Sequence, residues 1–210
     1  MSIRPEVWPW LIGSGSVALL SYGAWIYSDR LSFLIFFCLF AFISIFFVYF
    51  FRDPERTPDL EAADVWLAPA DGIITAVEEE KNGRTRIVIF LTVFNVHVNR
   101  MPIAGKIENQ EYRPGQFLPA FADELKQKNE QNRLQCLDQR GREFEVWQIA
   151  GLLARRIYCW KNISHTFERG ERFGMIALSS RTDLVLPQDV TPTVDCKDIV
   201  RAGQTVIARG

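Results

Sequence analysis

The sequence predicts a mainly β protein, an antiparallel β-sandwich or barrel-like domain preceded by a two-helix transmembrane hairpin. Residues 9–27 and 31–51 contain no charged side chain, and each segment is near the ~20 residues that a helix needs to cross a bilayer. From Val65 onward, apolar residues come in short runs separated by Gly and Pro, which is typical of antiparallel sheets. We therefore divide the 210 residues into a hairpin (1–51), a juxtamembrane linker (52–64) and a β domain (65–210).

The short link between the two apolar segments predicts a tight helical hairpin. Only Ser28, Asp29 and Arg30 separate the segments, so both outer ends should lie on one side of a membrane. The first segment carries small residues that should let it pack closely on the second: Gly13, Ser14, Gly15, Ser16 and Gly23. Its ends carry aromatic residues of the kind found at membrane interfaces: Trp8, Trp10, Trp25 and Tyr27.

Basic residues flank the hairpin on the side of the β domain. Arg4 precedes the hairpin, and Arg52 and Arg56 follow it. The positive-inside rule then favours the inner cell membrane with the β domain on the cytoplasmic face, by a small margin because Arg30 lies in the link. Arg52 and Arg56 can also contact lipid phosphates, and a plain stop-transfer flank explains them at least as well on charge alone. A signal peptide is the alternative for the first segment, but its flank is weakly basic and a second apolar run follows at once.

The β domain reads as a series of short strands joined by turns. A hairpin turn is expected at Asn82-Gly83, and an Asp-Gly turn at Asp71. Residues 119–131 fit either a short helix or a polar loop. The expected strands are 65–68, 73–77, 85–93, 107–112, 132–137, 144–150, 155–160, 175–178, 184–186 and 199–208.

Composition narrows the class of function. The formal net charge is −1, so no strong field favours nucleic acid as a partner. The chain has two histidines, which argues against a multi-histidine metal site, and we expect no metal. Its four cysteines lack metal-ligand spacing and read as free thiols in a reducing compartment.

A pair of serines, Ser179 and Ser180, separates the apolar runs 175–178 and 184–186. One interpretation is a β-hairpin in which the serine hydroxyls bond local backbone. The other is self-cleavage, in which Ser180 attacks the carbonyl of Ser179, forms an ester, and eliminates to leave a pyruvoyl group at the new N-terminus. Spacing alone does not choose between them.

Five motifs in order resemble the short, membrane-anchored type of phosphatidylserine decarboxylase, from about Phe51 to the C-terminus. They are Phe51-Arg-Asp-Pro54, Pro69-Ala-Asp-Gly72, Phe94-Asn-Val-His-Val-Asn-Arg100, Gln148-Ile-Ala-Gly151 with Ala154-Arg-Arg-Ile157, and Gly170-Glu-Arg-Phe-Gly-Met-Ile176. The resemblance implies a decarboxylase that converts phosphatidylserine in the membrane to phosphatidylethanolamine. Since fold alone does not fix activity, the site motifs carry this expectation.

The resemblance also implies autocatalytic cleavage between Ser179 and Ser180. The products would be a large chain (1–179) and a small chain (180–210) that stay together as a heterodimer, with a possible higher homo-oligomer. Ser180 would become the pyruvoyl cofactor and form a Schiff base with the substrate, so pyridoxal phosphate is not expected. Ser179 departs from the family, which usually has Gly at that position.

The resemblance names further site residues. His97 would move protons, since its side chain titrates near neutrality; a lone histidine is otherwise often structural. Asp71 matches the acidic partner of this histidine, although an ordinary Asp-Gly turn is the alternative. Arg100 stands where longer family members have a second histidine. Arg155 and Arg156 can hold a phosphate or form structural ion pairs, and His165 reads as structural.

Two alternatives remain open from the sequence. The substrate can be another serine-bearing phospholipid, such as one with an archaeal ether-linked core, because the headgroup chemistry would be the same. The chain can also be a non-enzymatic, membrane-tethered β-domain, since residues 200–206 resemble the turns of lipoyl- or biotin-carrier barrels. Lys106 and Lys197 are then the nearest attachment candidates, and neither lies in an attachment motif.

Overall fold

In a computed structural model of the chain, the described residues are 2–58, 64–80, 82–116, 128–151, 156–177 and 180–210. They form two compact units, Met1–Glu55 and Arg56–Gly210. The expectation of a helix or loop at 119–131 falls mostly on residues outside this set, as do Leu178, Ser179 and Arg155.

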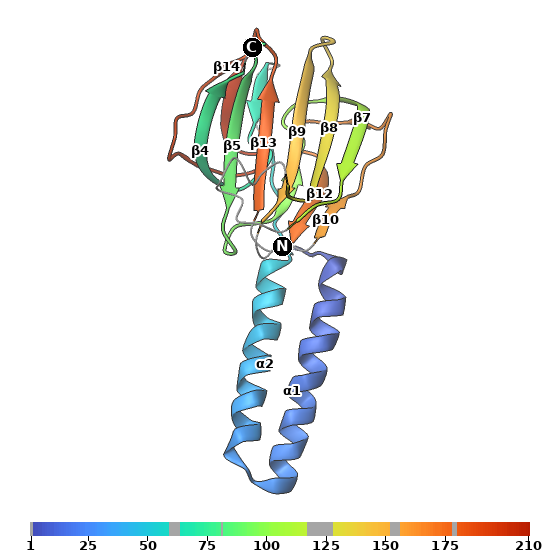
Figure 1. Cartoon of the computed structure of the whole chain (residues 1–210), viewed down its shortest axis with the longest axis vertical. Coiled ribbons are helices and arrows are strands. Elements are labelled where there is room, and N and C mark those ends of the chain that lie inside the picture. Colours follow the sequence, from blue (N-terminus) through green and yellow to red (C-terminus); the bar gives the residue numbers. More distant parts are fainter. Residues whose placement is uncertain (1, 59–63, 81, 117–127, 152–155, 178–179) are drawn as a thin grey trace. The chain divides into compact units, whose positions relative to one another are not determined.

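The helices come first in the chain, and the second unit is built from strands (Figure 1). The first unit contains β1 (Ser2–Ile3), η1 (Pro5–Val7), α1 (Trp8–Ser28), α2 (Leu31–Phe50) and β2 (Arg52–Asp53). The second unit contains β3 (Val65–Leu67), β4 (Gly72–Glu79), β5 (Thr85–Leu91), β6 (Val98–Arg100), β7 (Gly105–Arg113), β8 (Gln131–Asp138), β9 (Glu143–Ala150), β10 (Arg156–Cys159), β11 (Thr166–Phe167), β12 (Arg172–Ala177), β13 (Ser180–Leu186), β14 (Thr191–Pro192), β15 (Ile199–Val200) and β16 (Val206–Arg209).

The first unit is an antiparallel helix pair, which confirms the predicted hairpin. Helix α1 ends where Asp29 takes a left-handed conformation (φ 50°) while its N–H still bonds the Trp25 carbonyl at 2.8 Å. The hydroxyls of Ser14 on α1 and Ser44 on α2 lie 2.7 Å apart and join the two helices. Strands β1 and β2 pair, so the two ends of the unit lie side by side.

The predicted glycine packing in this hairpin is wrong. A Cβ atom built on Gly13, Gly15 or Gly23 would meet no described atom within 4 Å, so these glycines do not lie against α2. The small residues of α1 that are buried are Ser14 and Ala18. The sequence could not reveal which side would be used, because residues 13–16 are all small and point to different sides of the helix.

One described helix has the length and composition of a membrane span. Helix α2 covers Leu31–Phe50 with a mean hydropathy of 2.9 over its most apolar window. Helix α1 is as long but does not reach the same apolar level. The predicted crossing of the bilayer by α1 therefore stays a prediction, and the membrane signal rests on α2.

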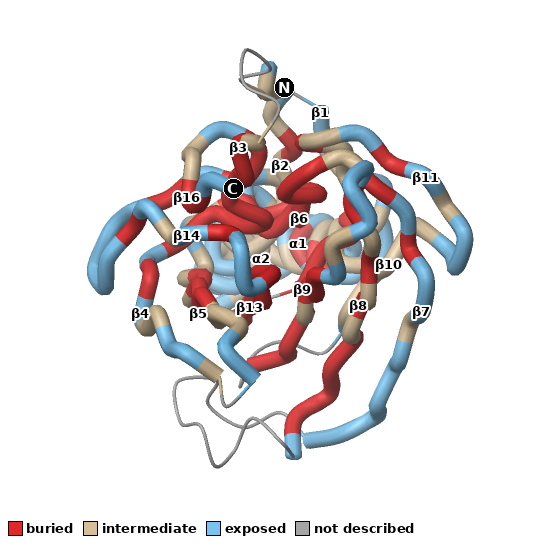
Figure 2. The backbone as a smooth tube through the Cα atoms, turned by 90° about the horizontal axis from the view of Figure 1, so that it is seen from above, coloured by how far each residue is buried: buried red, intermediate tan, exposed pale blue. Residues whose placement is uncertain are grey.

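Three antiparallel sheets form the second unit, and this confirms the mainly β prediction (Figure 1). The largest has eight strands in the order β11-β7-β8-β9-β13-β5-β4-β15, and its two end strands do not pair, so the described sheet is not a closed barrel. The smaller sheets have the orders β10-β12-β6 and β14-β16-β3. Figure 2 shows buried residues concentrated along the inner strands, β13 and β9 among them.

The core lies between the large sheet and the smaller sheets. It draws Ile89 from β5, Leu184 from β13, Val146 from β9 and Ile207 from β16. Trp66 on β3 meets Phe144 on β9 edge to face, with ring centroids 5.0 Å apart. Alternate residues of β13 enter this core, since Leu184 and Leu186 belong to it and Val185 does not.

Most predicted strands are present, and their pairing decides against one interpretation of the serine pair. The hairpin at Asn82-Gly83 is confirmed, because β4 pairs with β5 and Gly83 has a φ of 75°. The β-hairpin interpretation of the serine pair does not fit the described strands. Strand β12 pairs with β10 and β6, whereas β13 pairs with β5 and β9. The predicted run 199–208 is also split, with β15 and β16 in different sheets.

Candidate active site

Ser180 is the first residue of β13, at the centre of the large sheet. It lies opposite Leu91 of β5 and Ala150 of β9, and its exposed fraction is 0%. Its side chain shares the inner face of β13 with Thr182 and Leu184, because alternate residues of a strand point the same way. Among the described residues, the Ser180 hydroxyl oxygen is buried without a hydrogen-bond partner.

An unpartnered buried hydroxyl costs stability and calls for an explanation. Ser180 also begins the strand that follows directly on the proposed cut, while β12, which precedes the cut, belongs to another sheet. The chain therefore changes sheets within the few residues around Ser179 and Ser180. Residues 178–179 themselves lie outside the described set.

His97 lies directly before β6 and is fully buried, with an exposed fraction of 0%. The turn before it is fixed by Asn95, whose side-chain oxygen accepts the N–H and the hydroxyl of Thr92, both at 2.8 Å. The Nδ1 atom of His97 lies 3.0 Å from the Asn95 carbonyl oxygen. A carbonyl only accepts, so Nδ1 carries the proton in the neutral ring and Nε2 is the basic nitrogen.

The segments that carry His97 and Ser180 are adjacent in space. The Ile176 N–H donates to the His97 carbonyl at 3.3 Å, which places the end of β12 beside His97. Asn99, two residues after His97, donates to the hydroxyl of Thr182, two residues after Ser180, at 3.2 Å. The structure therefore brings the predicted base and the predicted cleavage site to the same region of the domain.

Asp71 lies in the turn between β3 and β4 and is held by Arg56. The guanidinium donates to both carboxylate oxygens, at 2.5 and 2.8 Å, and it also donates to the Ala202 carbonyl at 2.7 Å. The Ala202 N–H donates to the same carboxylate at 2.8 Å. The next position, Gly72, requires glycine, because a Cβ atom there would lie 2.2 Å from the Phe90 carbonyl oxygen. No described contact joins Asp71 to His97, so its role as the histidine's partner stays a prediction.

A contact of Arg56 with lipid phosphates, one of the two interpretations of this flank, does not fit the geometry of its side chain. Its side chain is 7% exposed and its guanidinium is bound to Asp71 and Ala202. Arg52 donates to the Tyr49 carbonyl and lies over the Tyr49 ring, 3.8 Å from its centroid. The sequence could not separate the two arginines, because both follow an apolar helix and both precede a proline-containing stretch.

Comparison with known proteins decides the family. A profile of phosphatidylserine decarboxylase matches residues 43–208. The chain belongs to the phosphatidylserine decarboxylase family. Curated relatives named phosphatidylserine decarboxylase proenzyme include those of Ruegeria pomeroyi (45% identity over 177 residues; 79% of this chain and 80% of the relative), Nitratidesulfovibrio vulgaris (42% over 218; 100% and 95%) and Gluconacetobacter diazotrophicus (46% over 173; 78% and 76%). Membership in a decarboxylase family overturns the alternative of a non-enzymatic β-domain.

The other residues named from the sequence, Arg100, Arg156 and His165, each contact another residue of the β domain. Arg100, at the position of the second histidine in longer members, donates to the Gly170 carbonyl at 3.0 Å and is buried. Arg156 is exposed and lies 5.9 Å from the centroid of the Tyr158 ring. His165 contacts Glu171 at 3.1 Å. Burial opposes ionisation of Glu171, but bonds from Lys161, the Glu168 N–H and His165 prevail and lower its pKa.

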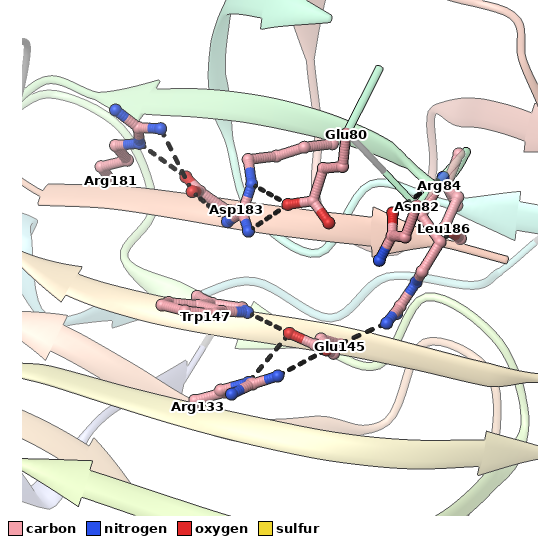
Figure 3. A network of polar contacts seen from close by, with 10 residues as sticks. Glu80, Asn82, Arg84, Arg133, Glu145, Trp147, Arg181, Asp183 and Leu186 are labelled. Atoms are coloured by element: carbon pink, nitrogen blue, oxygen red, sulfur yellow. Dashed lines mark hydrogen bonds and ion pairs between the residues drawn. The ribbon is translucent and has the colours of Figure 1, made fainter. Parts of the chain in front are cut away.

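An ionic cluster that the sequence motifs do not indicate lies on the face of the large sheet opposite to the core (Figure 3). In this outer-face cluster, Asp183 of β13 accepts bonds from Arg181 at 2.6 and 3.1 Å and from Arg86 of β5 at 2.9 Å. Arg86 also binds Glu80, at 2.8 and 2.5 Å. Asp183 has an exposed fraction of 0%. Strict alternation on β13 could have revealed that Arg181 and Asp183 share one face.

On β8 and β9, the same outer face of the large sheet carries a second group of ionic contacts, centred on Glu145. Its carboxylate accepts bonds from Arg133 at 2.9 and 2.7 Å, from Trp147 at 2.7 Å and from Arg84 at 3.1 Å. Burial alone would raise the pKa of Glu145, but these bonds outweigh burial and hold the pKa below its ordinary value. In the part of the chain that is described, no group of three or more His, Cys, Asp or Glu side chains could hold a metal ion.

Proposed function

We propose that this chain is a proenzyme that cuts itself before Ser180 and then decarboxylates phosphatidylserine to phosphatidylethanolamine. Family membership supports the reaction, and the names of the relatives support a proenzyme. The assignment to Ser180 rests on its hydroxyl oxygen, which is buried without a hydrogen-bond partner among the described residues. Ser180 is also the first residue of strand β13.

In the proposed cleavage, the Ser180 oxygen attacks the carbonyl carbon of Ser179, and His97 accepts the hydroxyl proton at Nε2. The Ser179–Ser180 C–N bond then breaks, the freed amine takes a proton, and an ester remains. Loss of the Ser180 α-proton expels the Ser179 carboxylate and leaves dehydroalanine. Hydrolysis of dehydroalanine releases ammonia and gives the pyruvoyl group. The tautomer set by the Asn95 carbonyl suits His97 to this role.

The residues around position 180 fit a pyruvoyl group, since the side-chain oxygen of Ser180 is buried and has no hydrogen-bond partner among the described residues. A pyruvoyl group supplies a carbonyl that binds the amine of a serine headgroup and takes up the electrons left when carbon dioxide departs. His97 would hold and return the proton needed at the former α-carbon of the substrate. Asp71, which Arg56 and the Ala202 N–H hold in place, would orient the His97 ring.

We further propose that the large chain (1–179) and the small chain (180–210) stay together after cleavage. Strand β13 pairs with β5 and β9 along its length, and Asp183 binds Arg86 of the large chain. Helix α2 would anchor the protein in the inner membrane, with the catalytic domain on the cytoplasmic side, as the flanking arginines favour. The lipid substrate would then reach the site from that membrane.

Reductive trapping tests this function. Purified protein is incubated with headgroup-labelled phosphatidylserine and cyanoborohydride, and the chains are separated by mass. Label should appear on the small chain, and His97→Ala should still fold but lose turnover. Ser180→Ala is the matched control and should take no label. Label on the large chain alone, or bound pyridoxal whose absorbance is lost together with activity, would overturn the proposal.

A further inference from the structure

A row of side-chain hydrogen bonds crosses the domain from β7 to β13. Gln110 donates to Asn132 at 2.9 Å, and Asn132 donates to Gln148 at 2.9 Å. Gln148 donates to Asn99 at 2.9 Å, and Asn99 donates to Thr182 at 3.2 Å. We call these five residues the amide chain. It ends on β13, two residues after Ser180.

The amide chain occupies positions that the strand pattern assigns to the core. Asn132 shares the inner face of β8 with Leu134, and Gln148 shares the inner face of β9 with Val146. Asn99, Gln148 and Thr182 have exposed fractions of 0%, and Asn132 has 1%. Buried amides are costly unless they are hydrogen-bonded, and apolar residues would fill these positions at less cost. A polar row in the core therefore needs a reason beyond packing.

Backbone carbonyls fix the direction of these hydrogen bonds. The Gln148 Nε2 atom also donates to the Tyr158 carbonyl, and the Asn99 Nδ2 atom also donates to the Pro69 carbonyl, each at 3.4 Å. A carbonyl accepts only, so the nitrogen end of each amide must face it. Every link consequently donates toward β13, and such aligned bonds reinforce one another. The Asn99 amide cannot rotate without breaking three bonds.

Glycine in a family motif makes room for this arrangement. A Cβ atom on Gly174 of β12 would lie 2.7 Å from the Gln148 Nε2 atom and 2.4 Å from the Tyr158 carbonyl oxygen. A larger residue there would push Gln148 away from Asn99. The same β12 strand pairs with β6, which carries Asn99.

Asn99 connects the segments that carry the candidate site residues. It follows His97 by two residues, its side chain reaches the Pro69 carbonyl two residues before Asp71, and it reaches Thr182 two residues after Ser180. Strands β6 and β13 belong to different sheets and share no ladder of backbone bonds among the described strands. The Asn99–Thr182 bond is thus a direct polar link between the sheet that carries His97 and the strand that carries Ser180.

We propose that Asn99 and Thr182 are positioning residues that hold Ser180 in register with His97 for self-cleavage, and that Gln148 holds the Asn99 amide in its donating orientation. The inference rests on the proposed function, because it assumes that Ser180 is cut and that His97 is the base. Among the described residues, neither Asn99 nor Thr182 hydrogen-bonds to the Ser180 hydroxyl. Their effect is on geometry, and a small misplacement of reacting groups slows a reaction by an order of magnitude or more.

The test measures the cleavage rate of the full chain after pulse synthesis, with the small chain detected by mass. Thr182→Val keeps the shape and removes the hydroxyl, so cleavage should slow by about tenfold or more. Thr182→Ser restores the hydroxyl and should cleave near the wild-type rate. Asn99→Ala should also slow cleavage, and the double variant should be no slower than the slower single variant, because both changes remove the same bond.

Gln135→Ala is the matched control, since it removes an exposed amide–amide bond of 2.8 Å from Asn109 and leaves the Asn109 oxygen that accepts the Gln110 N–H in place. It should cleave at the wild-type rate. Thermal unfolding of each variant separates lost folding from lost positioning, and Asn99→Ala replaces Thr182→Val if the latter does not fold. Wild-type cleavage by Thr182→Val, or failure of Thr182→Ser to restore the rate, would overturn the inference. An uncut wild-type chain would instead overturn the proposed function.

Discussion

Asp183 offers the sharpest test of how β13 is held in the large sheet. Asp183→Asn removes a fully buried charge that binds Arg181 and Arg86. Breaking one side of a buried ion pair costs about 3–5 kcal/mol. The amide keeps one accepting oxygen, and Arg86 keeps Glu80, so the lower end of this range applies. A domain of this size is stable by about 5–15 kcal/mol, so the expected loss is large.

The assay is thermal unfolding in detergent, followed by circular dichroism. A cost of about 3 kcal/mol should lower Tm by about 6–12 °C. The matched control is Asp189→Asn, also in the proposed small chain. Asp189 is 63% exposed and contacts Arg142 at 3.3 Å, so its loss should cost less than about 1 kcal/mol. Equal melting of the two variants would refute the reasoning that the outer-face cluster holds β13.

Three further predictions follow from the same contacts. Arg56→Ala should cost about 1.5–3 kcal/mol in domain stability, because its hydrogen bonds to the Asp71 carboxylate are lost. Arg52→Ala is the control and should leave the melting temperature of the domain unchanged. Equal losses of stability in the two variants would contradict this prediction. Glu145 has a lowered pKa, so its carboxylate stabilises the fold above its unfolded pKa of about 4.3. Glu145→Gln should therefore be less stable at pH 7, and the difference from wild type should shrink as the pH falls below about 4; a constant difference in acid titrations of Tm would refute it. Deleting residues 1–51 should reduce activity on bilayer lipid more than on a short-chain soluble analogue, and equal losses would argue against anchoring.

Strand positions were largely predictable because their signals are local. Asn82-Gly83 specifies its hairpin through glycine's left-handed backbone, and an apolar-rich run of eight residues marks β9. The pairing of strands was not predictable in the same way, because it depends on segments that are distant in the sequence. The apolar runs on either side of Ser180 look like two arms of a hairpin, yet β13 is completed by β5 and β9, which are distant in sequence. Only the three-dimensional context decides which edge a strand joins.

The site was predictable as a set of motifs but not as a set of contacts. His97 and Ser180 were named from the sequence, and their segments are adjacent in the structure. A lipid contact and a plain stop-transfer flank both stay open for Arg56 from the sequence, because nothing local shows that its guanidinium reaches Asp71. Asn132 lies in an expected strand and Gln148 in one of the five motifs, but neither signal shows that their amides bond each other in the core. Their parity with Leu134 and Val146 was the available signal.

The mass of the purified chain tests the central claim most directly. Wild-type protein should give two chains, with a cut between Ser179 and Ser180, and Ser180→Ala should give one intact chain. Ser179→Ala should still be cut, because its hydroxyl is not the nucleophile, and Ser179→Gly should be cut at least as fast. An intact Ser179→Ala chain together with a cut Ser180→Ala chain would make Ser179 the nucleophile and contradict the account.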